Sequence, residues 1–264
     1  MLSNLGSLLR YRGLIQSLVA RELKARYRGS VLGFLWSFVN PLLLLSVYSF
    51  VFTTIMRSDD PRTPQPFALF LFCGLLPWTW FSASLTESAS SLISGGNLIK
   101  KVLFPAEVLP IVSVLANMVH FALGLAILAV FMIGFRHYPN PAALPWFPVV
   151  VVIQLVFTLG LALGLSALTV HFRDIRDLLA NLLTLWFFGT PIIYPYFMRS
   201  VGRFLWLFRL NPFYHLAVSY QEILFFDHFG HARSLLLLGA LSIMMFLGGY
   251  WLFDRLRDSF AEAV

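Results

Sequence analysis

A basic segment that runs directly into a long apolar stretch constrains this chain more than any other feature. Arg21, Lys24, Arg26 and Arg28 precede an apolar stretch that covers about residues 31–56. Crossing roughly 30 Å of hydrocarbon takes about 20 apolar residues at the helical rise, so this stretch is long enough to span a bilayer. Lys and Arg collect in cytoplasmic loops. The pattern therefore predicts a first transmembrane span that leaves the N-terminus in the cytoplasm.

The composition of the whole chain agrees with a membrane protein. Of 264 residues, 59% are hydrophobic and 12% are charged, whereas a soluble domain has roughly 25% charged residues. We therefore expect an all-α membrane protein with no sizeable soluble domain. The net charge of +7 lies mostly near the ends of the expected spans, where orientation and anionic headgroups account for it, so no nucleic-acid partner is expected. Cys73 is the single cysteine and predicts neither an intrachain disulfide nor a metal site.

Hydropathy predicts six transmembrane helices. They cover about residues 31–56, 67–91, 107–134, 146–170, 178–194 and 234–253. With the N-terminus inside, the cytoplasmic segments hold twelve Lys and Arg residues and the outer segments hold seven. This bias, most of which comes from residues 1–30, predicts that both termini are cytoplasmic.

Two further segments are expected to be helical without spanning. Residues 5–28, within an N-terminal region of residues 1–30, place apolar residues on one face and basic residues on the other, which is typical of a helix lying in the headgroup plane. A helix packed against a partner is the alternative, and the two roles are compatible. Residues 196–226 are rich in aromatic side chains, but charged residues divide them into pieces too short to span, which predicts short re-entrant helices before the last span. We expect the remainder, residues 31–264, to form one permease domain.

The chain lacks the common motifs of catalysis and nucleotide binding. It contains no G-x-x-x-x-G-K-[ST] loop, no H-E-x-x-H and no G-x-S-x-G, and its histidines are scattered, so no catalytic or metal-binding residue is predicted. A transporter of this kind must use an ion gradient or a separate ATPase. An ion-coupled transporter predicts broken helices in two repeated halves, and a membrane-embedded glycosyl- or acyltransferase needs polar residues gathered at one membrane face. Neither pattern is found in the sequence.

The segment of residues 97–105 follows two glycines and ends at a proline. Asn97 can cap a short helix and Pro105 can end it. Apolar side chains lie there on both sides of Lys100 and Lys101. From chemistry alone, this segment is either a docking helix for another protein or a cytoplasmic turn whose apolar groups rest on the membrane.

Five motifs in a fixed order give the chain a family resemblance. They are RYRGSVLGFLWSFVNPLLLL at residues 26–45, GNLIKKVLFPAEVLP at 96–110, FRDIRDL at 172–178, TPIIYP at 190–195 and LNPFYHL at 210–216. Over essentially its whole length the chain resembles the membrane permease of ABC-type exporters that move bacterial cell-surface polysaccharides such as O-antigen, capsule and teichoic acid. The nearest alternative is an ABC-type permease that exports a different lipid or a drug.

The resemblance implies a partner and a mechanism. It implies a homodimer in the bacterial inner membrane, bound to two copies of a separate ATPase that carries ATP and Mg. This chain itself would hold no cofactor, catalyse no covalent chemistry and export a polysaccharide attached to a polyprenyl-diphosphate lipid. The segment of residues 97–105 would be the coupling helix that docks into the ATPase. Its candidate residues are Asn97, Leu98, Ile99, Lys100, Lys101, Val102, Phe104, Pro105 and Glu107.

Aromatic and charged residues supply candidate substrate contacts. Sugars pack their C–H faces on aromatic rings, although Trp and Tyr also gather at membrane interfaces regardless of function. Glu87 is an acid within the second span, which suits either a hydrated path or a structural role near the membrane surface. The candidates for a glycan path are Trp36, Tyr48, Trp78, Trp80, Glu87, Tyr194, Tyr196, Trp206 and Tyr214.

The basic residues before the first span are candidates for a lipid headgroup. Guanidinium groups bind a diphosphate in bidentate fashion. The simpler reading is that these charges orient the chain and contact anionic bulk lipid. The headgroup candidates are Arg21, Lys24, Arg26 and Arg28.

Overall fold

The computed structural model describes residues 11–26, 28–30, 32–51, 54, 64–96, 98, 105–197, 205–226 and 228–260. Every regular element within these residues is a helix. Four helices are long and apolar enough to cross a membrane: α4 (Phe67–Ser94), α6 (Val108–Gly134), α7 (Trp146–His171) and α12 (Ala232–Leu256). They coincide with four of the six spans expected from hydropathy.

The two remaining expected spans correspond to shorter helices. The 3₁₀ turn η1 (Gly33–Leu35) leads into α3 (Trp36–Phe50), which has 15 residues, and α8 (Ile175–Phe188) has 14. At a rise of 1.5 Å per residue each is about 21–23 Å long, which is less than the roughly 30 Å of a hydrocarbon core. The count of six spans therefore stays a prediction.

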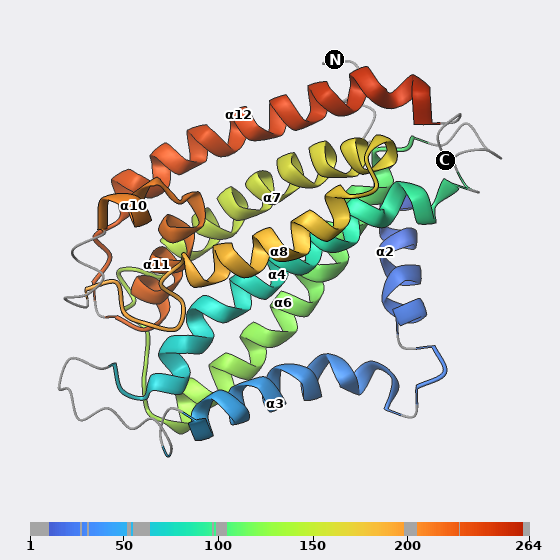
Figure 1. Ribbon diagram of the computed structural model, residues 1–264. Coiled ribbons are helices and arrows are strands. Elements are labelled where there is room, and N and C mark those ends of the chain that lie inside the picture. The colour runs from blue at the N-terminus through green and yellow to red at the C-terminus, as the bar shows by residue number, and fades with distance from the viewer. Residues whose placement is uncertain are drawn as a thin grey trace.

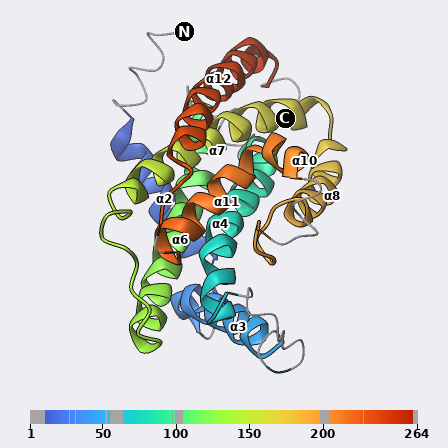
Figure 2. The same ribbon diagram turned by 90° about the vertical axis from the view of Figure 1, so that its left-hand side faces the viewer.

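The core is built around α4. Figure 2 shows α4 in the middle of the bundle, with α3 beyond one side and α8 beyond another. Trp78 and Phe81 of α4 pack on Phe213 of α11 (Pro212–Leu224), with ring centroids 4.9 and 4.8 Å apart, respectively. Phe81 also lies edge-on to Trp186 of α8, at 5.3 Å. Large aromatic side chains thus join α4, α8 and α11.

Small residues bring α7 and α12 into close contact. A Cβ atom added to Gly160 of α7 would lie 2.6 Å from the backbone of Met245 in α12, and one added to Gly249 of α12 would collide with the carbonyl oxygen of Gly160. Close approach through small residues is the usual way in which membrane helices pack, because lipid tails remove the hydrophobic driving force between them.

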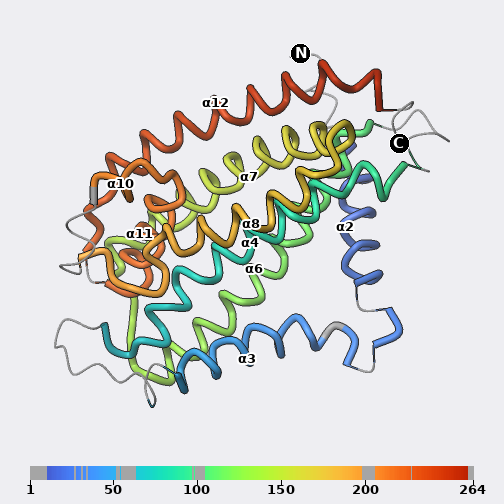
Figure 3. The backbone as a smooth tube through the Cα atoms, in the orientation of Figure 1, coloured from blue at the N-terminus to red at the C-terminus, as the bar shows by residue number. Residues whose placement is uncertain are grey.

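The two ends of the bundle differ in structure. In Figure 1, α2 (Arg12–Arg26), the C-terminal end of α4, the N-terminal end of α6 and the 3₁₀ turn η3 (Arg257–Ser259) lie at one end, and α10 (Leu205–Leu210) and α11 lie at the other. Figure 3 shows that α2 crosses its end of the bundle at a steep angle instead of continuing into α3. We call these the α2 end and the α11 end.

The helix α2 lies within the range expected for the interfacial helix, and part of its apolar face packs on protein. Leu18 contacts Val108 and Val112 at the start of α6. The packing places Arg26, the last residue of α2, beside α4 and α6. Residues 5–10 and Tyr27 of the expected helix lie outside the described residues.

Candidate functional site

Three charged and polar side chains from three helices meet near the α2 end, and we call Arg26, Glu87 and Asn117 the inner cluster. Nη2 of Arg26 donates to both carboxylate oxygens of Glu87 at 2.7 Å, and Nη1 donates to Oδ1 of Asn117 at 3.2 Å. Nδ2 of Asn117 donates to Oε2 of Glu87 at 2.6 Å and to the carbonyl oxygen of Ser113 at 2.9 Å. An acid within an apolar helix needs a partner, and Glu87 has two, the guanidinium of Arg26 and the amide of Asn117. The side chain of Glu87 is 35% exposed and that of Arg26 is 26% exposed.

The inner cluster separates two cavities. The first, which we call the inner chamber, has a volume of about 500 Å³ and is lined by Arg26 and Asn117 together with residues of α3 and α4. The second has about 420 Å³ and is lined by Glu87, by Arg21 and Glu22 of α2, and by serines of α4. Arg26 and Asn117 therefore face one cavity while the carboxylate of Glu87 faces the other.

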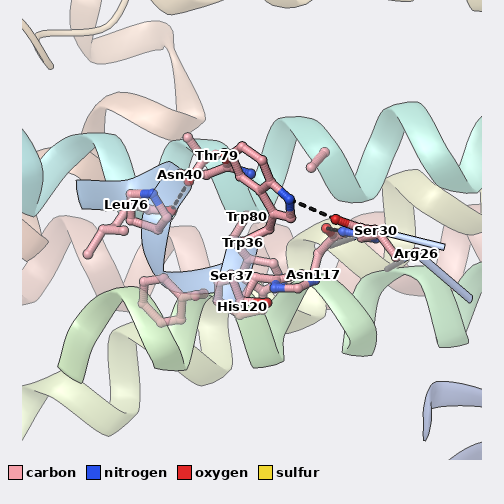
Figure 4. A pocket seen from close by; sticks show the side chains of 13 residues that line it. Arg26, Ser30, Trp36, Ser37, Asn40, Leu76, Thr79, Trp80, Asn117 and His120 are labelled. Atoms are coloured by element: carbon pink, nitrogen blue, oxygen red, sulfur yellow. Dashed lines mark hydrogen bonds between the residues drawn. The ribbon is translucent and has the colours of Figure 1, made fainter. Parts of the chain in front are cut away.

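The inner chamber combines hydrogen-bonding groups with aromatic rings (Figure 4). Its polar lining beyond the inner cluster comes from Ser30, Trp36, Ser37, Asn40, Thr79 and His120. Nε1 of Trp36 donates to Oγ of Ser30 at 2.9 Å, which ties the start of α3 to the segment after α2. Trp80 and Phe121 also line the chamber, and their rings stack with centroids 4.9 Å apart. A polar ligand of moderate size would find both donors and acceptors here.

A second carboxylate, Glu222 of α11, is enclosed at the opposite end, and we call Glu222, His231 and Tyr196 the outer cluster. Oε1 of Glu222 accepts from Nδ1 of His231 at 2.7 Å and from the Tyr196 hydroxyl at 3.0 Å. Oε2 accepts from the backbone N–H groups of Gly230 and His231 at 2.8 and 3.2 Å. The side chain is 1% exposed. All of these donors point at one carboxylate, which braces the connection between α11 and α12.

The surroundings of the outer cluster keep the carboxylate ionised and the phenol neutral. Burial alone would raise the pKa of Glu222, but the hydrogen bonds from His231, Gly230 and Tyr196 bring it below the ordinary value for glutamate. Burial, with the negative charge of Glu222 next to it, raises the pKa of the Tyr196 hydroxyl. Tyr196 is therefore a donor and Glu222 an acceptor at neutral pH.

Asn211 joins the end of α8 to the start of α11. Its Oδ1 accepts from the backbone N–H of Phe213 at 2.9 Å, as a helix N-cap, and from Nε1 of Trp186 at 2.6 Å. Its Nδ2 donates to the carbonyl oxygen of Gly189 and to Oγ1 of Thr190, both at 2.9 Å. Two of the sequence motifs, TPIIYP and LNPFYHL, thus meet through one amide side chain.

Comparison with known proteins identifies the family. The family model described as ABC-2 type transporter matches residues 13–225. The chain belongs to this family. The O-antigen export system permease protein RfbA of Myxococcus xanthus is 44% identical to this permease over 263 residues, which cover 97% of each chain. The RfbA protein of Klebsiella pneumoniae is 32% identical over 259 residues, which cover 98% of the permease and 96% of that protein.

A more distant relative is the polysialic acid transport protein KpsM of Escherichia coli. It is 24% identical over 246 residues, which cover 89% of the permease and 90% of KpsM. The family and the full-length relatives confirm the resemblance stated from the motifs. Together with the long apolar helices, they make this chain a multi-pass membrane transport subunit.

The structure separates the four headgroup candidates of the permease. Arg26 belongs to the inner cluster, and Arg21 lines the second cavity. Lys24 and Arg28 are exposed. These positions do not form one basic patch around a single cavity, and Arg26 is the candidate that lines the inner chamber.

The glycan-path candidates fall into four places. Trp36 and Trp80 line the inner chamber, with Glu87 behind it. Trp78 and Tyr214 are buried in the core. Tyr194, Tyr196 and Trp206 lie at the α11 end, where Tyr194 donates to the carbonyl oxygen of Phe188 at 2.6 Å and Trp206 is largely exposed. Tyr48 of α3 is half-buried against the core. Their assignment to a glycan path stays a prediction.

Most of the candidate coupling residues, Asn97, Ile99, Lys100, Lys101, Val102 and Phe104, lie outside the described residues. The structure describes Leu98, Pro105 and Glu107. Leu98 packs against a cluster that includes Phe253 and Phe260. Glu107 is buried, and its Oε2 lies 3.9 Å from Nη2 of Arg257. Leu98, within the coupling segment, and Glu107, just after it, thus both contact the C-terminal end of the described chain.

Sequence reasoning missed three polar residues that organise the sites. Asn117 stands out as an amide within the apolar sequence of α6, and a polar residue at such a position is a signal of partners. Asn211 precedes a proline at the start of a helix, which is the pattern of an N-cap followed by proline at the first helical position. Glu222 is one of the charged residues that divide residues 196–226, and its burial could not be deduced from one sequence.

Proposed function

We propose that this permease is the transmembrane subunit of an ATP-driven exporter that carries a polysaccharide, attached to a polyprenyl-diphosphate lipid, across the bacterial inner membrane. The observation that carries this proposal is the similarity, over nearly the full length of both chains, to permeases named for O-antigen export. The relation to KpsM, which is named for polysialic acid transport, extends the similarity to a second polysaccharide.

The energy for export comes from a separate ATPase, which binds ATP and Mg. Membership of the ABC-2 family supports such a partner, and the sequence of this chain has no phosphate-binding loop of its own. The ATPase docks on the cytoplasmic segment of residues 97–105. Because Leu98 and Glu107 contact the C-terminal turn and its neighbours, movement of this segment would reach α12 as well as α4 and α6.

The proposed architecture has six spans, cytoplasmic termini and two copies of the chain. Residues 1–30 form the cytoplasmic interface region and residues 31–264 the permease domain. A row of exposed apolar side chains on α8, namely Leu178, Leu182 and Leu185, supports contact of this helix with lipid or with the second copy. The excess of Lys and Arg in the N-terminal region supports its cytoplasmic location.

The polysaccharide would pass aromatic side chains toward a gate at the α11 end. Residues 196–226 form this gate, with α11 buried against α4 and α10 exposed. Rings near it, such as Tyr194, Tyr196 and Trp206, can hold sugars weakly, so that the polymer slides without stalling at any one residue. Arg26, which lines the inner chamber, binds the diphosphate of the lipid at the cytoplasmic side. Arg21, Lys24 and Arg28 attract the anionic headgroup toward that side.

Deletion of the gene in its host, followed by complementation, tests the function. We expect the deletion to remove the polysaccharide from the cell surface while the lipid-linked polymer accumulates inside, and the restored gene to reverse both effects. A host whose surface polysaccharide is unchanged by the deletion, but whose content of another lipid or whose drug resistance changes, would show that the permease exports a different substrate.

Co-purification tests the coupling segment. Replacing Phe104 with Asp is expected to abolish binding of the ATPase while membrane insertion persists, because a charge replaces an apolar contact. Phe135→Asp, at an exposed position after α6, is the matched control and should retain the ATPase. Normal recovery of the ATPase with the Phe104 variant, together with normal export, would remove the coupling role from this segment.

A further inference from the structure

We propose that the inner chamber and an apolar groove beside it form one binding site for a single-chain lipid with a diphosphate headgroup. The headgroup occupies the inner chamber and the chain lies in the groove between α3 and α4. This inference rests on the proposed function, because it states where the lipid end of the exported substrate binds.

The chamber and the groove are continuous. The groove has a volume of about 470 Å³, and its apolar lining comes from Leu43, Leu44, Val47, Phe72 and Leu75. Asn40, Pro41, Leu76 and Thr79 line both the groove and the chamber. The combined space therefore changes from polar at one end to apolar at the other, which is the shape and polarity of an amphiphile.

Arg26 supplies the charge at the polar end. A guanidinium has five N–H donors, and its three contacts with Glu87 and Asn117 use at most three of them. Arg26 also lines the chamber. Its remaining donors, with Asn117 and Asn40 nearby, suit phosphoryl oxygens, which a planar guanidinium binds strongly. Glu87 lines the second cavity and is not among the residues that line the chamber.

The polarity of the site matches the orientation of a lipid in the inner leaflet. Along α3, Ser37 and Asn40 line the chamber, and Leu43 and Val47, further along, line the groove. Along α4, which runs in the opposite direction in Figure 1, Phe72 and Leu75 line the groove and Ala83 lines the chamber. The chamber thus lies nearer the α2 end, which is the proposed cytoplasmic end, and the groove leads away from it toward the middle of the bundle.

The observations favour one lipid class among those of the inner leaflet. The groove, at about 470 Å³, is no larger than the chamber, and this favours a lipid with one chain over a glycerophospholipid, which carries two chains and one phosphate. The chamber is as large as the groove and offers polar groups on several sides (Figure 4). A diphosphate on a single polyprenyl chain satisfies both parts of the site.

Binding to the purified full-length permease in detergent tests this proposal, with geranylgeranyl diphosphate as the probe. Native mass spectrometry would compare it with inorganic diphosphate, geranylgeraniol and phosphatidylglycerol. We expect the probe to bind with a Kd at least about tenfold lower than that of each of the other three. Phosphatidylglycerol that binds as tightly as the probe, or inorganic diphosphate that does so, would overturn the proposal.

Two variants separate the parts of the site. The double variant Arg26→Gln with Glu87→Gln removes both charges together and leaves neither unpaired, and it should weaken the probe about tenfold. Thr79→Trp fills the junction of chamber and groove from an exposed position, so it should abolish binding of the probe and spare inorganic diphosphate. Leu237→Trp, at an exposed position of α12, is the control and should bind the probe normally.

The results distinguish this inference from the proposed function. Probe binding that is unchanged in Thr79→Trp and in the double variant would overturn the site, even if the wild-type permease restores surface polysaccharide. Failure of the wild-type gene to restore surface polysaccharide would overturn the function, and probe binding would still be measured independently.

Discussion

The inner and outer clusters each hold a carboxylate between helices, and they differ in how that carboxylate is satisfied. Glu87 is about one-third exposed and is bound by one guanidinium and one amide. Glu222 is almost fully buried and accepts four hydrogen bonds, two of them from backbone N–H groups. Cavities flank the first carboxylate, whereas protein groups enclose the second.

This difference indicates two roles. A buried carboxylate with several fixed donors stabilises one arrangement, because removing it leaves those donors unpaired. A partly exposed pair contributes little to stability and can exchange partners with a ligand. We therefore assign the outer cluster to holding α11 and α12 together, and the inner cluster to binding.

The largest effect is expected when the outer carboxylate is removed. Glu222→Leu leaves Tyr196, His231 and the N–H of Gly230 without their acceptor and should lower the free energy of unfolding by about 3 kcal/mol. Thermal unfolding of the purified protein would measure this loss. Glu222→Gln, which keeps one acceptor oxygen, should lose less. A Glu222→Leu variant as stable as the wild type would contradict the proposal that Glu222 holds α11 and α12 together.

Asn211 should have the next largest effect. Asn211→Ala removes the N-cap of α11 and the acceptor of Trp186, and it should destabilise the protein by about 2 kcal/mol. Asn181→Ala is the matched control, because that amide lies exposed on α8 and bonds only to the carbonyl oxygen of Asp177 among the described residues. Equal unfolding temperatures for the two variants would contradict the role of Asn211.

The inner cluster should contribute less to stability. A double-mutant cycle of Arg26→Gln and Glu87→Gln is expected to give a coupling energy of about 1 kcal/mol or less, since both side chains are partly exposed. Unfolding of the two single variants and the double variant supplies the cycle. A coupling energy as large as the loss in Glu222→Leu would erase the distinction between the clusters.

Lowering the pH should also distinguish the two clusters, and its effect on stability should be the smallest of those predicted. The pKa of Glu222 is held below its ordinary value of 4.5, so its ionised form adds stability above that pH, and this stability is lost as the pH falls through the lower, folded-state pKa. Glu222→Gln should reduce the dependence of the free energy of unfolding on pH in this range. If the variant shows the same pH dependence as the wild type, another group causes the acid effect.

The sequence predicts the long helices well and the sites less well. Continuous apolar runs determine α4, α6, α7 and α12, because length and hydropathy suffice to identify them. The helices α3 and α8 are shorter than the apolar runs that predicted them. Gly189 and Thr190 follow α8, and Asn211 bonds to both, so a tertiary contact accompanies the end of this helix.

Partners across helices could not be predicted from one sequence. Arg26 and Glu87 are both candidates by composition, but their contact depends on how α2 packs through Leu18 onto α6. The burial of Trp78 and Tyr214 likewise follows from the position of α11 beside α4. Periodicity reports which residue types are present on a helix, whereas the neighbours of that helix decide whether a ring lines a path or fills the core.

Reconstituted export tests the central claim most directly. The permease and its ATPase would be placed in liposomes that carry a labelled polyprenyl-diphosphate polysaccharide on the ATPase side, and the label reaching the opposite side would be measured. The account predicts transfer that requires ATP and the permease and is strongly reduced by Thr79→Trp. It also predicts that Leu237→Trp, at an exposed position of α12, transfers the label at the wild-type rate. Transfer that proceeds without ATP, or an ATP-driven complex that leaves the polysaccharide on its original side, would contradict the account.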